Sequence, residues 1–242
     1  MHSFRSLTLL LAFALPALPA AFAQSSNGSS SSSTAQPAPT QGQLTVQARI
    51  RQRREQRRAT AIHDAYDHRW ETFTDMGYLR FKPGPAVQRL TWYAWETGLT
   101  RFSTERLGYT LDARGYFGNA YVGLNQQSQG AFTRPEISMF NVMAGPTYRF
   151  YLQPKYSVSG RVLAGWAHGN FSGDTNGVPP TLLGLYPDND TYAASAAVIG
   201  EYNVSQNFVF KLAPEYFLTG FGSTTQASRG FTAGMTFRFG KQ

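Results

Sequence analysis

The sequence of 242 residues contains no cysteine. A fold stapled by disulfides is therefore excluded, and no lipid-modified cysteine is expected. Beyond the first 23 residues no run of about 18 apolar residues occurs, so no transmembrane helix is expected. Charged residues make up only 15% of the chain, and aromatic residues are almost as frequent at 14%. Modest hydropathy combined with many aromatic residues is typical of transmembrane β-barrels.

The N-terminus reads "MHSFRSLTLLLAFALPALPAAFAQ". One positive charge, Arg5, precedes an apolar stretch over residues 7–18, and a small-residue pair, Ala21 and Ala23, follows it. This order predicts a secretory signal peptide over residues 1–23, cleaved between Ala23 and Gln24. A buried N-terminal helix is the less favoured alternative, because the apolar run is short. The sequence thus predicts export.

Two further segments precede the rest of the chain. Residues 24–43 are rich in serine and are predicted to be a disordered linker, because they cannot bury enough apolar surface to offset their ordering entropy. Residues 44–69 lack glycine and proline and are predicted to form a basic, mostly solvated periplasmic helix. Its arginines are Arg49, Arg51, Arg53, Arg54, Arg57 and Arg58. They suggest a solvated spacer, a contact with an anionic lipid surface or envelope polymer, or a segment folded back on its neighbour. Export argues against nucleic acid as the partner.

From residue 70 onward, short runs with alternating apolar and polar residues are separated by turn residues. Eight strands are predicted, over residues 70–81, 90–102, 107–117, 137–150, 156–171, 191–204, 208–221 and 230–239. Short and long connections alternate between them, as in barrels with tight periplasmic turns and long outer loops. The predicted fold class is all-β, an antiparallel eight-stranded transmembrane up-and-down β-barrel over residues 70–242 with an N-terminal periplasmic helical segment.

Charged residues within these strands fall on the face opposite the large apolar residues. The predicted inward charges are Asp75, Glu96, Asp112, Arg114, Arg149, Arg161, Glu201, Lys211, Glu215 and Arg238. Buried charges require partners, and five acids here match five bases. Eight strands enclose only enough space for side chains. We therefore expect a neutral, filled lumen rather than an ion-selective pore. A soluble barrel or sandwich, with the large residues inside, is the alternative.

Five stretches carry a resemblance to a known family. They are "GYLRF", "LGYTLDARGYFG", "FNVMAGPTYRF", "PEYFLTGFG" and "GFTAGMTFRFG". Between residues 70 and 240 the chain resembles the small outer-membrane β-barrels of the OmpA/OmpX-like type. The resemblance implies a location in the outer membrane of a Gram-negative cell, contact with membrane lipid and lipopolysaccharide, and insertion by the barrel-assembly machinery. The last stretch resembles the family's C-terminal insertion signal, which implies that role for Phe237 and Phe239.

The main functional hypothesis is a porin-like barrel that is not an enzyme and serves envelope integrity or surface contact. No cofactor is expected, and no metal site, because cysteine is absent and histidines are not clustered. One alternative is a lipid A-modifying enzyme, a deacylase or acyltransferase, centred on His168 with Ser172 and Asp174 nearby. That cluster is a weak motif, and a histidine at the barrel rim beside polar loop residues is the favoured explanation. A small passive channel is the second alternative.

Overall fold

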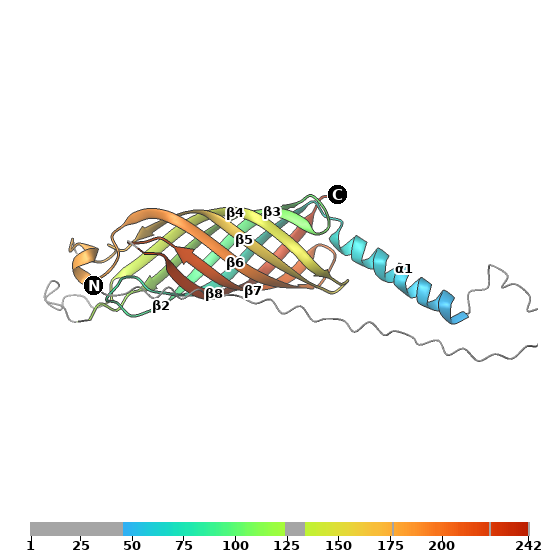
Figure 1. Cartoon of the computed structure of the whole chain (residues 1–242), viewed down its shortest axis with the longest axis horizontal. Helices are drawn as coiled ribbons and strands as arrows, with labels where there is room; N and C mark the ends of the chain where they lie inside the picture. Colours follow the sequence, from blue (N-terminus) through green and yellow to red (C-terminus); the bar gives the residue numbers. More distant parts are fainter. Residues whose placement is uncertain (1–45, 124–133, 176, 223, 242) are drawn as a thin grey trace, which may run out of the picture. The chain divides into compact units, whose positions relative to one another are not determined.

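The protein folds as a closed antiparallel barrel of eight strands, and the computed structural model describes residues 46–123, 134–175, 177–222 and 224–241 (Figure 1). Each strand pairs with its neighbours in sequence, and β8 pairs with β1 to complete the ring. The strands are β1 (Trp70–Phe81), β2 (Leu90–Phe102), β3 (Leu107–Asn119), β4 (Glu136–Leu152), β5 (Tyr156–Asn170), β6 (Asn189–Asn203), β7 (Phe208–Thr219) and β8 (Gln226–Phe239). A helix, α1 (Val46–Tyr66), precedes β1, and a short 3-10 helix, η1 (Pro180–Leu183), lies between β5 and β6. The predicted fold class is confirmed.

The barrel has two different ends. Short turns at residues 103–106, 153–155 and 204–207 lie at the end where β1 begins and β8 finishes, and we call it the helix-side end. There the amide of Arg69 donates to the carbonyl of Gly240 at 2.8 Å, which ties the start of β1 to the end of β8. The described parts of the longer connections, residues 82–89, 120–123, 134–135, 171–175, 177–188, 220–222 and 224–225, lie at the opposite, loop-side end. The predicted alternation of short and long connections is therefore present.

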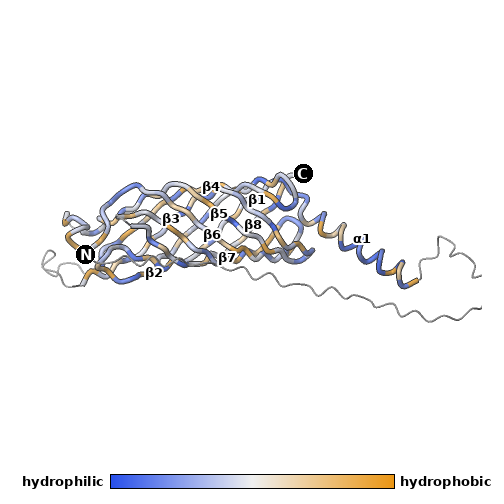
Figure 2. The backbone as a smooth tube through the Cα atoms, viewed as in Figure 1, coloured by the Kyte–Doolittle hydropathy of each residue, from blue (hydrophilic) through white to orange (hydrophobic). Residues whose placement is uncertain are grey.

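Side chains alternate between the two faces of the wall, apart from a bulge in β4 where Phe150 and Tyr151 are both exposed. Buried positions face the lumen and exposed positions face outward, and hydrophilic and hydrophobic residues are interspersed along the strands (Figure 2). The outward positions hold large apolar residues, such as Met76, Tyr93, Leu111, Val162 and Leu212. The inward positions near the middle hold charged and polar residues. Because a soluble protein places its charges outside, this inverted arrangement is the one expected of a wall in contact with hydrocarbon.

Aromatic side chains gather near both ends of the outward face. Toward the loop-side end they are Tyr78, Tyr93, Trp95, Phe117, Phe140, Trp166, Tyr192 and Phe231, and toward the helix-side end they are Trp70, Tyr148, Phe150, Tyr156, Tyr202, Phe208, Phe237 and Phe239. Two aromatic girdles that flank an aliphatic band are characteristic of transmembrane barrels. None of the described helices is long and apolar enough to cross a membrane.

The loop-side half of the lumen is a conventional hydrophobic core. Phe81 stacks on Trp92 with ring centres 4.0 Å apart, and Phe171 meets Phe221 edge-on at 5.2 Å. The connections close over this core, because the amide of Tyr186 donates to the carbonyl of Pro83 at 2.8 Å. The backbone at Gly84 approaches the carbonyl of Gly184 so closely that a side chain at residue 84 would collide with it. The loop-side end is thus covered by its own connections.

Candidate functional site

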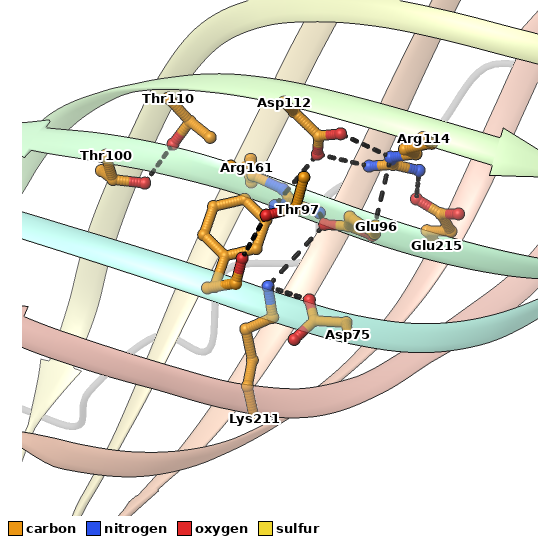
Figure 3. A network of polar contacts seen from close by, with 12 residues as sticks. Asp75, Glu96, Thr97, Thr100, Thr110, Asp112, Arg114, Arg161, Lys211 and Glu215 are labelled. Atoms are coloured by element: carbon orange, nitrogen blue, oxygen red, sulfur yellow. Dashed lines mark hydrogen bonds and ion pairs between the residues drawn. The ribbon is translucent and has the colours of Figure 1, made fainter.

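The middle of the lumen contains a network of buried ion pairs centred on Arg114 (Figure 3). Its guanidinium donates in a bidentate manner to Asp112, at 2.9 Å from Nε and 3.0 Å from Nη2. Nη1 donates to Glu215 at 2.6 Å and to the Tyr116 hydroxyl at 3.2 Å. β3 places Asp112, Arg114 and Tyr116 on one face because they are two residues apart, and β7 supplies Glu215 across the lumen.

Two more cations extend this network toward the helix-side end. Arg161 on β5 donates to Glu96 at 2.8 Å and lies 3.4 Å from Asp112. Lys211 on β7 pairs with Asp75 and lies 3.7 Å from Glu96. The Lys211 ammonium also lies 3.7 Å from the ring centre of Phe73, so an aromatic face shields it on another side. Carboxylates and cations therefore alternate across the lumen rather than clustering by sign.

A second network closes the helix-side half of the lumen. Glu71 accepts from both Arg149 and Arg238, and Arg238 also donates to Glu201 at 2.8 Å. The Glu201 carboxylate accepts a further hydrogen bond from Ser157 at 2.6 Å. All ten predicted inward charges are buried in the lumen, where these two networks hold them.

Glu71 is the lumen charge that the sequence interpretation missed. It is only 4% exposed and bridges two arginines. With Glu71 added to Asp75, Glu96, Asp112, Glu201 and Glu215, six acids face five bases in the described lumen, so the predicted equal count is wrong by one carboxylate. The signal was present in the sequence: residue 71 lies four positions before Asp75 and therefore on the same face of β1.

The last turn of α1 is anchored at the helix-side end by Tyr66. Its side chain is fully buried, its hydroxyl donates to the Gln153 carbonyl at 2.9 Å, and Asn203 Nδ2 donates to that hydroxyl at 2.9 Å. The guanidinium carbons of Arg238 and Arg149 lie 4.8 Å and 5.1 Å from the ring centre. The Tyr66 ring therefore covers the helix-side network, with two cations facing its π-system.

A second contact joins α1 to a turn at the helix-side end. His63 Nδ1 lies 2.6 Å from Glu105 Oε1, in the turn between β2 and β3. That hydrogen bond is the main cause that raises the pKa of His63 above its ordinary value of 6.5. Toward the other end of α1 the arginines are exposed, and in the described part of the helix Arg49, Arg51, Arg53, Arg54, Arg57 and Arg58 form no ion pair. Arg58 donates to the Gln153 side chain at 2.6 Å.

The lumen contains little free space. A void lined by both networks, including Glu71, Arg149, Arg161 and Lys211, has a volume of about 20 Å³. That is room for about one water molecule. The aromatic core fills the loop-side half and Tyr66 covers the opposite end. Within the described residues, this packing leaves the lumen filled by side chains.

In the part of the chain that the structure describes, no contact joins the three residues of the enzyme hypothesis to one another. His168 points outward from β5, with Nδ1 2.7 Å from Asp190 Oδ1, and stacks beside Trp166. The Ser172 hydroxyl donates to Asp188, and among the described residues no contact joins it to His168. Asp174, in the following turn, has a positive φ of 56°. A nucleophile hydrogen-bonded to a base, which acyl transfer requires, is thus not assembled from His168, Ser172 and Asp174.

The remaining predicted site residues divide by position. Phe237 and Phe239 lie on the outward face of β8 at the helix-side end, with ring centres 6.2 Å apart. Ala23 and Gln24, at the predicted cleavage site, lie outside the described residues, as does the Ser-rich linker. In the described ranges no group of three or more histidine, aspartate or glutamate side chains is arranged to hold a metal ion.

Comparisons with known proteins concern the barrel. No protein-family model matches the chain, and no curated protein matches it. Neisserial surface protein A shares 13% identity, covers 70% of this chain and 97% of its own, and gives a TM-score of 0.48. Ail of Yersinia pestis, in complex with the heparin analogue sucrose octasulfate, shares 14% identity with the same coverage of 70% and 97% and a TM-score of 0.46. OprG from Pseudomonas aeruginosa shares 9% identity, covers 72% and 98%, and gives 0.46.

The fold of this chain, a closed antiparallel barrel of eight strands, is established by its own strand pairing. At these identities the similarity concerns the fold alone, so function has to be argued from the residues of this chain.

Proposed function

We propose that this protein is an integral outer-membrane barrel with a closed lumen, serving envelope integrity or surface contact rather than transport or catalysis. The observation that carries the proposal is the inverted distribution of side chains, with ion pairs inside and an apolar, aromatic-girdled wall outside. In this proposal the signal peptide is cleaved after Ala23, the helix-side end faces the periplasm, and Phe237 and Phe239 form part of the signal read by the assembly machinery. Membrane lipid and lipopolysaccharide surround the wall.

Cell fractionation followed by gel electrophoresis, with and without boiling, tests this proposal. We expect the chain in the outer-membrane fraction, with a mobility that shifts on boiling, because folded barrels resist detergent until heated. A mature chain that is monomeric and folded in buffer without detergent contradicts it. Planar-bilayer recordings address the channel alternative, for which the void of about 20 Å³ offers no path, and we expect no discrete conductance.

The enzyme alternative receives less support from the geometry, because His168 pairs with Asp190 and Ser172 with Asp188. It makes a clear prediction of its own. A His168→Ala variant that still shows the heat-dependent shift but changes the mass profile of lipid A would favour it. An unchanged profile removes it.

A second proposed role concerns the arginines of α1. Six exposed arginines, from Arg49 to Arg58, have no ion-pair partner in the described helix, and Tyr66 anchors that helix to the barrel. Such an arrangement suits contact with an anionic envelope polymer on the periplasmic side. Binding of the purified protein to isolated cell-wall sacculi tests it, with all six arginines replaced by glutamine for comparison. We expect binding that weakens as salt rises and is lost in the variant; equal binding by both proteins contradicts it.

A further inference from the structure

The outward wall has a hollow that the proposed function leaves unexplained. A groove of about 530 Å³ runs over β5, β6, β7 and β8. It exists because small or flat residues occupy outward positions on adjacent strands. They are Gly160 on β5, Ala196 on β6 and Pro214 on β7, with Val162, Val198 and Tyr216 beside them, and β8 lines the groove with Arg229 and the backbone at Gly230.

Arg229 lies at one edge of this groove and is the only charged residue in its lining whose side chain points outward. Directly opposite Arg229, across the seam that closes the barrel, stands Arg80 of β1. Both arginines are exposed on the outward face. In the same two strands the next outward pair toward the helix-side end is Tyr78 and Phe231, whose rings meet edge-on at 4.5 Å. The arginine pair therefore stands just beyond the loop-side aromatic girdle, at the level of lipid headgroups.

Two arginines directly opposite each other on one face are unfavourable unless something compensates them. Opposed outward residues in an antiparallel pair have Cβ atoms only about 4.5–5.5 Å apart, and like charges there destabilise the pairing. Arg80 Nη1 donates to the Thr91 hydroxyl at 3.0 Å, and no described acid pairs with Arg80 or Arg229. Most N–H donors of the two guanidinium groups therefore remain available, at the level where lipid headgroups meet the hydrocarbon.

We propose that Arg80, Arg229 and the groove together bind a phosphorylated lipid of the outer leaflet. A phosphate group lies between the two guanidiniums, whose planar forks suit phosphate oxygens. One acyl chain descends from it into the groove, where it contacts Val162 and Val198. The assignment rests on the proposed membrane location, with the loop-side end outward. Because the groove opens to hydrocarbon and has a cationic edge, its occupant is a lipid rather than a soluble anion.

The headgroup half of the site is tested by an Arg80→Gln/Arg229→Gln variant. Folded protein in detergent micelles is titrated with lipid A, and retained lipid is counted by native mass spectrometry. We expect affinity to fall by about tenfold or more, because two charge-assisted interactions are lost. Arg101→Gln, an exposed arginine on the helix-side part of the same wall, is the matched control and retains wild-type affinity. Dephosphorylated lipid A should bind the wild type and the double variant equally weakly.

The acyl half is tested by filling the groove. A side chain at Gly160 meets no backbone, since the nearest atom to an added Cβ is Phe150 Cε1 at 3.6 Å, so Gly160→Leu should fold normally. We expect it to weaken lipid A binding, whereas Ala113→Leu, outward on β3 and outside the groove, should not. If Gly160→Leu converts a dimer to a monomer without changing lipid binding, the groove is an interface between copies and the proposal is wrong. Equal affinity of wild type and both variants also overturns it.

The proposed function and this inference fail separately. A wild-type chain that shows no heat-dependent shift contradicts the membrane proposal and, with it, the lipid site on the wall. A chain that shows the shift but binds phosphorylated and dephosphorylated lipid A alike keeps the membrane proposal and loses the lipid site.

Discussion

At the scale of single residues, the buried ion pairs decide how the lumen behaves. Burying a charge away from water costs several kcal/mol unless opposite charges and hydrogen bonds surround it. Removing one member of a buried ion pair therefore leaves the other charge uncompensated. Arg114 is fully buried and serves three carboxylates, with Asp112 and Glu215 the nearest. It is therefore the residue whose loss leaves the most uncompensated charge.

We expect Arg114→Met to destabilise the folded barrel by about 3–5 kcal/mol, the range for removing one partner of a buried ion pair. Urea unfolding in phospholipid vesicles, followed by tryptophan fluorescence, measures the loss. Arg106→Met, at an exposed turn position, is the control and should stay near wild type. An Arg114→Met/Glu215→Gln variant should recover part of the stability, because one orphaned carboxylate is then neutral. A wild-type midpoint for Arg114→Met would contradict the charge network.

The His63–Glu105 contact predicts a pH dependence at the helix-side rim. Hydrogen bonding to Glu105 raises the pKa of His63 above 6.5, so the protonated imidazole binds the turn more strongly than the neutral one. A raised folded-state pKa gives a contribution that is complete below pH 6.5 and disappears as pH rises through the raised value. An NMR titration of the His63 ring should show the raised pKa, and Glu105→Gln should return it toward 6.5. If the pKa of His63 is the same in Glu105→Gln as in the wild type, the hydrogen bond between His63 and Glu105 is not formed in solution.

At the scale of elements, α1 is held mainly by its last turn, with one further hydrogen bond from Arg58 to the Gln153 side chain. A largely solvated helix has little stability of its own, and most of the buried surface of α1 belongs to Ala65 and Tyr66. The anchor therefore controls whether the arginines stay at the barrel mouth or move away on a loose tether.

We expect Tyr66→Ala to release α1 while the barrel stays intact. Large-to-small changes of buried aromatic residues cost about 3–5 kcal/mol, so amide exchange in the last turns of α1 should speed up at least roughly tenfold. Hydrogen-exchange mass spectrometry measures this, and the heat-dependent gel shift verifies that the barrel still folds. Tyr66→Phe keeps the ring over Arg149 and Arg238 and should show a smaller increase. Unchanged exchange in Tyr66→Ala would mean that α1 is held elsewhere.

The strands were largely predictable from the sequence. A wall between lipid and a polar lumen requires apolar and polar residues to alternate along each strand, and this alternation can be read from a single sequence. The bounds of β1 and β2 agree with the prediction, whereas β8 begins at Gln226 rather than at residue 230. Beyond the girdle both faces of β8 carry polar or small residues, Ser228 and Arg229 among them, so the alternation disappears although the strand continues. The same reason hid Glu71, since Thr72 and Thr74 weaken the contrast between the faces of β1.

Partnerships across the lumen were less predictable, because they depend on the shear of the closed barrel. Sequence reasoning placed ten charges inside, but it gave no indication that Arg114 of β3 would reach Glu215 of β7. The burial of Tyr66 was equally hidden, since its environment comes from residues more than 80 positions away. The groove arises from three adjacent strands that each place a small or flat residue outward, a coincidence visible only once the register is known.

At the scale of the whole molecule, the barrel wall has charged residues on its inner face and large apolar residues on its outer face, the reverse of a soluble protein. Water surrounds the charges of a soluble protein, and here other side chains surround them. The consequence is that stability depends on what lies against the outer wall, at a depth that the aromatic girdles define.

Two positions on the outward face of β3 separate a membrane barrel from a soluble one. Leu111 lies opposite Leu99 and Ala144 in the aliphatic band, and Tyr109 lies opposite Arg101 near the helix-side girdle. An arginine at the bilayer midplane costs about 2–4 kcal/mol, and near the interface about 0–1 kcal/mol. We therefore expect Leu111→Arg to lower the free energy of unfolding in phospholipid vesicles by the larger amount and Tyr109→Arg by the smaller. In a soluble barrel both positions would face water, and neither arginine would destabilise the fold. Equal stabilities of the two variants in vesicles would therefore mean that water, rather than hydrocarbon, lies against this wall.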